Sequence, residues 1–295
     1  MVALPLSVGV LLLVSAVALA ALDARRVCRR FPAATVETVL QRTPYLWAVL
    51  PLVATPVIAN VFFRFNDAAL WNLPVCLQYH LSGIHWAVAG VSFAYLSAFA
   101  ATVAYTTGHS ERHKLPVAGI IVVGLVQYAQ FVHTRPIAPR LTERISPDGV
   151  VLQTSGASCV PASAANIVRL LGGSATERQM AELLGSADGT SPAQVVYGLR
   201  PLGLQCELSR LEDADPSRLK PTTMLLVDHP ATGYASHAVV YAAARADRFE
   251  ILDPLLGKRL LTRDQLLARW HGHAIFCAPS AIRRRSPSGT GARST

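Results

Sequence analysis

Four apolar runs constrain the fold of this chain more than any other feature. They cover residues 2–22, 44–63, 84–106 and 115–133, and none of them contains Asp, Glu, Lys or Arg. Each run is close to the ~20 residues that an α-helix needs to cross a bilayer. The chain is 52% hydrophobic and only 15% charged, which is more apolar than a typical soluble protein. The sequence therefore predicts an all-α bundle of about four transmembrane helices within residues 1–133.

The net charge of +9 is distributed unevenly along the chain. Residues 1–150 hold 11 Lys and Arg against 6 Asp and Glu, residues 151–280 hold 12 of each kind, and residues 281–295 add four Arg and no acid. The excess basic charge lies beside the apolar runs and in the tail, where membrane topology accounts for it. The neutral part has no basic patch interleaved with aromatic residues, so nucleic-acid binding is not expected.

Lys and Arg close to the membrane predict the orientation, because cytoplasmic loops are enriched in these residues. The loops after the first and third runs hold seven of them: Arg25, Arg26, Arg29, Arg30, Arg42, Arg112 and Lys114. The opposite side holds Arg135, Arg140 and Arg144, with Arg64 at an edge. A multi-pass protein of the cytoplasmic membrane, with its C-terminal part on the outer face, is therefore expected.

A cleaved signal peptide is the alternative for the first run, because Ala18-Leu19-Ala20 resembles a cleavage site. Three spans would then remain, and the C-terminal part would lie inside the cell. Signal peptides carry positive charge in front of the apolar segment, and no Lys or Arg precedes this run.

Polar residues in the membrane half have two possible explanations. His80, His85, His109 and His113 fit a metal or haem site, or they are ordinary interfacial and loop histidines. Gln127, Gln130 and His133 recur at three-residue steps, so they share a helix face. They line a substrate path or form hydrogen bonds between helices.

The C-terminal half predicts one α+β domain. Residues 134–149 form a linker, residues 150–279 are long enough for a domain with its own core, and residues 280–295 form a basic disordered tail. Capping-box patterns start helices at Thr176 and Ser191, and Gly185 and Gly203 are plausible stops. Segments rich in Val, Ile, Leu and Tyr follow, and we expect strands at 204–209, 222–228, 236–244, 247–253, 256–261 and 273–278. Thr262 opens a last short helix through Trp270. Helices followed by a mostly antiparallel sheet are typical of an α+β fold.

A polar turn delivers Cys159 to the start of a predicted helix. Ser158 is a suitable N-cap residue, Pro161 lies in the first turn, and apolar residues continue to Gly172-Gly173. A thiol at a helix N-terminus meets the positive end of the helix dipole, which favours the nucleophilic thiolate. The pattern indicates a reactive cysteine.

A catalytic thiol needs a base and a group that orients the base. This half has four histidines, His229, His237, His271 and His273. His237 has the strongest case, because it opens a predicted strand that is followed by a hairpin partner ending in an acid. The next strand ends at Asp253-Pro254, and positions 237 and 253 are equidistant from a turn centred near residue 245. In an antiparallel hairpin these two residues face each other on one side of the sheet, so Asp253 is expected within reach of the imidazole.

Gln153 lies six residues before Cys159, and its side-chain amide can meet an oxyanion together with the backbone N–H of Cys159. The sequence thus combines Gln-x5-Cys at a helix start, a His that opens a strand, and an Asp-Pro that ends the next strand. The combination resembles the C39 peptidases. These are papain-like cysteine proteases that process bacteriocin leader peptides. The resemblance spans about residues 150–278 and includes Trp270-His271-Gly272. It implies that Cys159 is the nucleophile, His237 the base, Asp253 its orienting acid and Gln153 part of the oxyanion hole, with no cofactor or metal.

The sequence departs from this family at two neighbours of the cysteine. Ser158 and Val160 stand where the family usually has an acid and a glycine. The family's best-known members recognise a Gly-Gly leader and are fused to an ABC exporter, whereas no GxxxxGK[ST] motif occurs here. Degenerate C39-like domains that only bind peptides typically lack the cysteine, which is present here.

The remaining cysteines have structural explanations. No CxxC pair occurs, so a zinc ribbon or a thioredoxin site is not expected. Cys206 and Cys277 lie on predicted strands as buried small residues, or they form a disulfide if the domain lies outside the cell. Cys28, beside the arginines, is a weak candidate for acylation.

The sequence thus predicts a bacterial-type membrane-anchored cysteine peptidase that cleaves a peptide or leader sequence near the bilayer. Its partners would be a peptide or protein substrate, the lipid bilayer and an unidentified transporter or secretion system. Three alternatives remain: a papain-fold acyltransferase, a non-catalytic peptide-binding receptor or chaperone, and a metal- or haem-binding membrane module.

Overall fold

The computed structural model describes residues 6–31, 84–108, 113–187, 189–211, 213–230 and 235–280, together with short stretches between residues 38 and 78. The chain divides into two compact units, Met1–Arg135 and Pro136–Thr295. Each unit is described below by itself.

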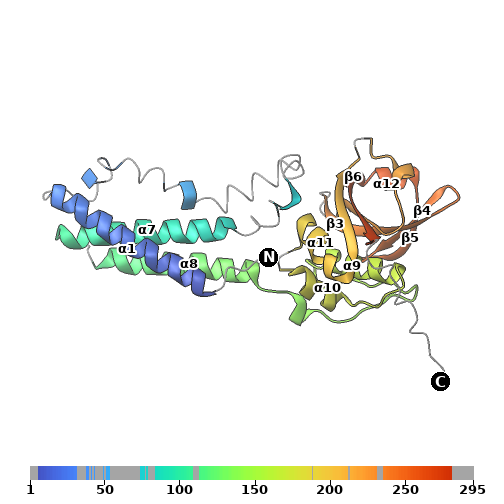
Figure 1. Cartoon of the computed structure of the whole chain (residues 1–295), viewed down its shortest axis with the longest axis horizontal. Coiled ribbons are helices and arrows are strands. Elements are labelled where there is room, and N and C mark those ends of the chain that lie inside the picture. The colour runs from blue at the N-terminus through green and yellow to red at the C-terminus, as the bar shows by residue number, and fades with distance from the viewer. Residues whose placement is uncertain are drawn as a thin grey trace, which may run out of the picture. The chain divides into compact units, whose positions relative to one another are not determined.

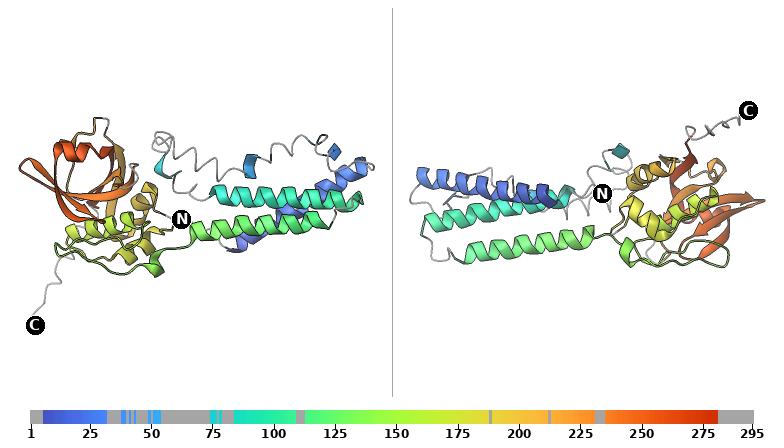
Figure 2. Two further views of the ribbon diagram at one scale, coloured as in Figure 1. Left: turned by 180° about the vertical axis from the view of Figure 1, so that it is seen from behind. Right: turned by 60° about the horizontal axis from the view of Figure 1, so that its bottom comes forward.

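The described residues of the first unit form three long helices, α1 (Leu6–Arg30), α7 (Ile84–Thr106) and α8 (Lys114–Thr134), which lie side by side in Figures 1 and 2. Helix α7 packs against both α1 and α8. Small and apolar side chains fill the α1–α7 contact, where Cys28 is buried with Phe99 and Val103. The same contact contains one polar link, because Tyr95 donates a hydrogen bond of 2.8 Å to Asp23.

Three of the four predicted spans coincide with these helices, and the run at 44–63 lies largely outside the described residues. Among the described helices, only Ala87–Thr106 is both long and apolar enough to cross a membrane, which is weak evidence for a membrane protein. Helix α1 continues through the charged residues that follow its apolar run, and the apolar stretch of α8 ends at Leu125, before Gln127. A bundle of four transmembrane helices is therefore unsupported.

The second unit begins with helices and continues with strands, as an α+β fold does. Its helices are α9 (Cys159–Leu170), α10 (Glu177–Leu184), α11 (Pro192–Gly198) and α12 (Arg263–Leu267), with single 3-10 turns at Ala138–Arg140, Arg200–Leu202 and Pro216–Arg218. Its strands are β1 (Leu204–Arg210), β2 (Thr223–Asp228), β3 (Ala235–Arg245), β4 (Arg248–Asp253), β5 (Gly257–Thr262) and β6 (Trp270–Pro279). They form one antiparallel sheet in the order β1-β6-β2-β3-β4-β5.

Local sequence signals set the helix starts. Thr176, Ser191 and Thr262 each form the predicted capping box with the Gln three residues later. Gly185 and Gly203 adopt the left-handed conformation that ends a helical segment. The strands fall within a few residues of the predicted segments.

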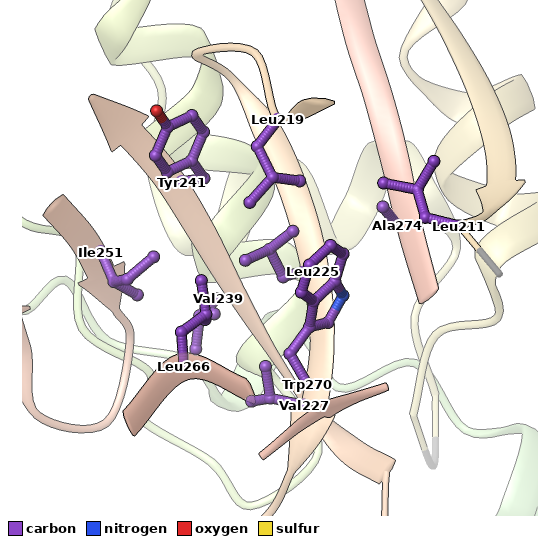
Figure 3. Packing of buried hydrophobic residues seen from close by; sticks show 10 residues of the cluster. All are labelled: Leu211, Leu219, Leu225, Val227, Val239, Tyr241, Ile251, Leu266, Trp270 and Ala274. Carbon is purple, nitrogen blue, oxygen red and sulfur yellow. The ribbon is translucent and has the colours of Figure 1, made fainter. Parts of the chain in front are cut away.

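The sheet buries both of its faces. Helix α9 packs on β2, β3 and β4. The opposite face carries the main apolar cluster, in which Trp270 and Leu266 of the α12 region cover Leu225, Val239 and Ile251 (Figure 3). The packed sheet therefore holds the side chains at its strand ends in fixed positions.

Two predicted boundaries differ from the structure. The last helix ends at Leu267, and Trp270 instead opens β6, because its buried side chain belongs to the core and its backbone pairs with Val227. The segment expected to be a linker contributes Ile137 and Leu141 to a small cluster against Ala181 of α10, so it packs on the second unit.

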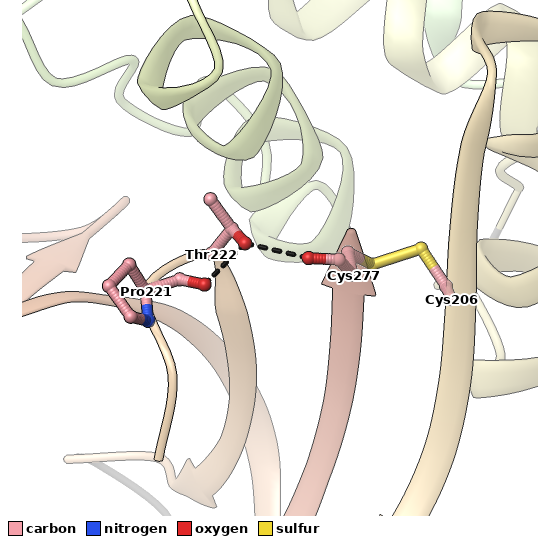
Figure 4. Close-up of a disulfide and its surroundings, with 4 residues drawn as sticks. All are labelled: Cys206, Pro221, Thr222 and Cys277. Atoms are coloured by element: carbon pink, nitrogen blue, oxygen red, sulfur yellow. Dashed lines mark hydrogen bonds between the residues drawn. A yellow bond between two sulfur atoms is a disulfide. The ribbon is translucent and has the colours of Figure 1, made fainter. Parts of the chain in front are cut away.

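Cys206 and Cys277 face each other on β1 and β6 and form a disulfide, with their Cα atoms 4.2 Å apart (Figure 4). The Thr222 hydroxyl donates a hydrogen bond of 2.7 Å to the Cys277 carbonyl. Of the two roles that the sequence allowed for this pair, the structure has the disulfide.

Candidate active site

Cys159 is the first residue of α9 and is 9% exposed. Ser158 occupies the N-cap position, but its hydroxyl donates to the Ser155 carbonyl at 2.8 Å and does not cap the helix. The preceding turn is thereby closed on itself, and it presents Cys159 at the positive end of the helix dipole. This position favours a thiolate.

His237 lies near the start of β3 and is 1% exposed. Its Nε2 atom lies 2.7 Å from Oδ1 of Asp253, which is also buried. The same Oδ1 accepts a hydrogen bond of 2.9 Å from the backbone N–H of Leu255. The backbone of its own turn thus fixes Asp253. Asp253 then fixes the imidazole of His237.

The side chains of His237 and Asp253 meet as predicted, although the predicted backbone register is wrong. Val240 pairs with Leu252, so the register places Asp253 opposite Val239 and not opposite His237. The hairpin turns at Ala246 and not at residue 245, and a bulge follows Tyr241. The shift of two residues preserves the side of the sheet, because side chains alternate with a period of two.

The charges of this pair are coupled. Burial alone lowers the pKa of His237, but the hydrogen bond with Asp253 and the interaction with Cys159 outweigh burial and raise the pKa from 6.5 to about 9. Burial raises the pKa of Asp253, but the hydrogen bond and charge of His237 outweigh it and hold the pKa below 3.8. A protonated imidazole beside an ionised Asp253 is the charge state that this arrangement favours.

Because Nε2 of His237 faces Asp253, the other ring nitrogen, Nδ1, is left for the thiol. Nδ1 is buried and has no partner of ordinary hydrogen-bond geometry among the described residues. The Cys159 sulfur is nevertheless close enough to raise the pKa of His237. Nucleophile–base pairs are often loosely aligned in the absence of substrate, so this geometry is compatible with a thiol–imidazole pair.

Gln153 lies in the same region as the other three candidate residues. Its backbone N–H donates to the Pro254 carbonyl at 2.8 Å, directly after Asp253. Its side-chain Nε2 donates to the Ser155 carbonyl at 3.2 Å, and its Oε1 is buried without a hydrogen-bond partner among the described residues. An amide nitrogen carries two hydrogens, so one remains for an oxyanion.

Two polar residues of α9 were not identified from the sequence. Asn166 accepts from the Val151 N–H at 2.8 Å and donates to the Val151 carbonyl at 3.0 Å. Ser163 donates to the Ala238 carbonyl at 2.9 Å, one residue after His237. They tie the helix of Cys159 to the segment before Gln153 and to the strand of His237. Both are buried on a helix rich in alanine. The only signal in the sequence that could have identified them is the presence of two polar residues among these small apolar ones.

In the part of the chain that the structure describes, the other histidines do not assemble a second site of this kind. The His229 ring lies edge-on to the His237 ring, with centroids 5.6 Å apart. His271 is exposed and lies 2.9 Å from Asp228, and His273 is buried on β6. Among the described residues no group of three His, Cys, Asp or Glu is arranged to hold a metal, while His80 and His109 lie outside them.

A groove of the second unit lies apart from these residues. It has a volume of about 1520 Å³ and lies at the Thr223 end of β2, beside Cys206 and Phe276. His237 pairs with Val227 at the other end of that strand. None of the four candidate catalytic residues lines the groove.

The second unit is similar to a known family of domains. Residues 148–282 match the model of the Peptidase C39 family. An uncharacterised protein of Methanothermobacter marburgensis is 28% identical over 116 residues, which cover 39% of this chain and 78% of that protein.

Solved structures of similar domains include a double glycine motif protease from an AMS/PCAT transporter, in complex with its leader peptide. It is 19% identical, with a TM-score of 0.39, and the match covers 47% of this chain and 93% of that chain. The peptidase domain of Streptococcus ComA, a bi-functional ABC transporter, is 20% identical, with a TM-score of 0.39 and coverage of 44% and 96%. From the family match, residues 148–282 of this chain are a Peptidase C39 domain.

Proposed function

We propose that this protein is a membrane-anchored cysteine peptidase that cleaves a peptide or leader sequence near the bilayer. The observation that carries the proposal is the buried His237–Asp253 pair, 2.7 Å apart, which interacts with Cys159 at the start of α9. The Peptidase C39 match supports the reaction class.

In the proposed mechanism the Cys159 thiolate attacks the scissile carbonyl carbon. The developing oxyanion accepts hydrogen bonds from the Gln153 amide and the Cys159 backbone N–H. The C–N bond then breaks as the His237 imidazolium gives its Nδ1 proton to the leaving amine. The neutral imidazole next takes a proton from water, the resulting hydroxide attacks the thioester, and the thiolate leaves. Asp253 keeps the imidazole oriented throughout.

Alkylation by iodoacetamide tests the assignment of the nucleophile. Cys159 should react fastest among the free thiols near neutral pH, and His237→Ala should slow it. Slow alkylation of Cys159 at the rate of Cys76, which is exposed, would contradict a stabilised thiolate.

Mass spectrometry of a peptide library tests the reaction. The wild type should produce cleaved peptides and Cys159→Ala should not. Products that carry an added amine in place of water would instead indicate acyl transfer. Unaltered cellular function in Cys159→Ala would indicate a peptide-binding module.

Comparing the secreted peptides of wild-type and Cys159→Ala cells would then identify the substrate and any transporter that exports it.

The membrane anchor is supported by the first unit. Large apolar side chains are exposed on two of its helices, at Leu11, Leu12, Val14, Val17, Leu19 and Leu22 of α1 and at Val117, Ile120, Ile121, Leu125, Tyr128, Phe131 and Val132 of α8. Lipid is the environment in which such faces are stable. Helix Ala87–Thr106 is apolar and long enough to span a bilayer. Retention of the protein in the membrane pellet after alkaline extraction tests the anchor.

An outward-facing peptidase domain is supported by the Cys206–Cys277 disulfide, because disulfides persist in oxidising compartments. A reporter fused after Thr295 that is active only in the cytoplasm should be inactive. Activity of that reporter would place the domain inside the cell.

A further inference from the structure

We infer that the Glu177 carboxylate is a positioning residue for the oxyanion hole, an inference that rests on the proposed peptidase function. Glu177 is the first residue of α10, and its side chain is completely buried. Its Oε1 accepts a hydrogen bond of 2.8 Å from the Thr154 backbone N–H, and its Oε2 accepts one of 2.6 Å from the Thr154 hydroxyl. Thr154 directly follows Gln153.

A buried carboxylate needs compensation for its lost hydration. In the described part of the chain no Lys or Arg forms an ion pair with Glu177. The two hydrogen bonds from Thr154 and the N-terminal end of α10 are what stabilise the charge. Both oxygens of the carboxylate are therefore directed to Thr154. We call Gln153–Ser155, the segment that contains it, the oxyanion segment.

The segment before Gln153 is held by other groups. The Asn166 amide clamps both backbone groups of Val151, and the Pro254 carbonyl accepts from the Gln153 N–H. These contacts fix Gln153 relative to α9 and to Asp253.

After Gln153, the chain is held at Thr154 by Glu177 and by the Thr142 N–H, which donates to the Thr154 hydroxyl at 3.3 Å, and Ser155 exchanges hydrogen bonds with Ser158. Glu177 is the only one of these groups that contacts both the backbone and the side chain of Thr154.

That part of the chain decides where the Gln153 amide points. The Gln153 Nε2 donates to the Ser155 carbonyl at 3.2 Å, and Ser155 follows Thr154. Ser155 also accepts from Ser158, which precedes the nucleophile. Releasing Thr154 from Glu177 would therefore displace the carbonyl that orients the Gln153 amide.

The displacement should act on the transition state. Oxyanion donors are effective within about 2.7–3.1 Å of the oxygen, and losing one costs on the order of 10²–10³ in kcat. A donor that is displaced but still present should lower kcat by a smaller factor than a donor that is removed. We expect Glu177→Gln to lower kcat about 10- to 100-fold with little change in KM, because the affected hydrogen bond forms only as charge develops.

The matched control is Glu182→Gln on the same helix. Glu182 is exposed and pairs with Arg178 at 3.2 Å, away from the oxyanion segment. This variant should keep wild-type kcat. Thr154→Val keeps the side-chain shape but removes the hydroxyl, which donates to Glu177 at 2.6 Å and accepts from the Thr142 N–H at 3.3 Å. It should reproduce the loss if Glu177→Gln does not fold.

Two probes separate positioning from general damage. Iodoacetamide alkylation of Cys159 needs a thiolate and no oxyanion hole, so its rate in Glu177→Gln should equal that of the wild type. Leupeptin is a peptide aldehyde that forms a tetrahedral adduct with the cysteine, and the oxygen of this adduct occupies the oxyanion hole. The affinity of Glu177→Gln for leupeptin should therefore fall about 10- to 100-fold, in parallel with the fall in kcat.

The outcomes are distinguishable. Wild-type kcat in folded Glu177→Gln and Thr154→Val, or an equal loss in alkylation rate, would overturn the positioning role. If instead the wild-type protein cleaves no peptide and binds no leupeptin although Cys159 is alkylated rapidly, the proposed function itself fails.

Discussion

At the scale of residues, His237 lies between Asp253 and Cys159 and has one ring nitrogen for each of them. Asp253 takes Nε2 at 2.7 Å, and this leaves Nδ1 for the thiol. The raised pKa of His237 records the two negative partners. Val160, which follows Cys159, is buried, so its branched side chain packs inside the domain.

Activity should fall as pH rises through about 9, since the pKa of His237 lies at about 9 and the imidazolium is the proton donor to the leaving amine. The raised pKa also means that the stabilising contribution of the protonated ring is complete below 6.5, its ordinary value, and is lost as pH rises through about 9. The pH profile of kcat/KM measures the first effect and urea unfolding at several pH values the second. An alkaline limb near 6.5 would contradict this assignment.

Asp253→Asn should lower kcat by about 10²- to 10⁴-fold while the fold is retained. The amide keeps the shape but removes the negative charge that raises the pKa of His237, so the alkylation rate of Cys159 near neutral pH should fall as well. Asp264→Asn, in the first turn of α12, is the control for removing a carboxylate from the domain. Unchanged peptide cleavage in Asp253→Asn would remove Asp253 from the mechanism.

At the scale of elements, the sheet order decides which ends of the chain are held together. Strand β6 lies between β1 and β2, so the last strand of the domain contacts the first. The disulfide joins β1 to β6 across 71 residues of sequence. Gly272 allows a close backbone approach at the other end of the same pair, because an added Cβ would lie 2.1 Å from the Leu211 carbonyl oxygen.

Removing the disulfide should lower the free energy of unfolding by about 2–5 kcal/mol, since it closes a long loop in the unfolded chain. Thermal unfolding of Cys159→Ala, with and without reductant, measures the effect without interference from the nucleophile. Cys277→Ala should match the reduced protein. An identical midpoint in all three samples would argue against the disulfide.

Gly272→Ala should destabilise the domain by at least about 2 kcal/mol more than Gly172→Ala. Both glycines have a positive φ, +88° and +82°, so both substitutions carry the same backbone strain. Only Gly272 faces a backbone carbonyl, whereas an added Cβ at Gly172 meets no atom within 4 Å. Chemical denaturation of the two variants compares them, and equal losses would refute the steric explanation.

At the scale of the whole molecule, the two units differ in what covers their apolar surfaces. The peptidase domain buries both faces of its sheet, whereas α1 and α8 expose rows of large apolar side chains. Charge does not follow this division, because residues 1–150 carry a net charge of +5, residues 151–280 are neutral, and residues 281–295 carry +4.

Leu125→Arg should weaken membrane association if α8 contacts lipid. Leu125 is 61% exposed near the middle of α8, where a charged residue costs about 2.5–3.5 kcal/mol in a bilayer. Leu256→Arg, at a 49% exposed position of the peptidase domain, is the matched control. The fraction of each variant in the membrane pellet measures the difference, and equal fractions would argue against lipid contact at α8.

Much of the fold could be predicted because its signals are local. Each capping box lies within four residues, and the strands follow short apolar segments between turns. The disulfide was left open because it depends on β1 lying next to β6, which no local pattern encodes. The end of the last helix was mispredicted because Trp270 fits a helix locally but is buried in the core as a strand residue.

The sequence by itself determined the chemistry of the candidate site: a thiol at a helix start, and a His and an Asp on neighbouring strands of a hairpin. Only the tertiary structure decided how these groups are held. The observed pairing differs from the expected one by two residues, so the side chains of His237 and Asp253 stay on one side of the sheet and still meet. Glu177 reaches Thr154 across 23 residues and Asn166 reaches Val151 across 15. Such contacts follow from helix packing, where burial leaves each polar group only the partners that the fold brings to it.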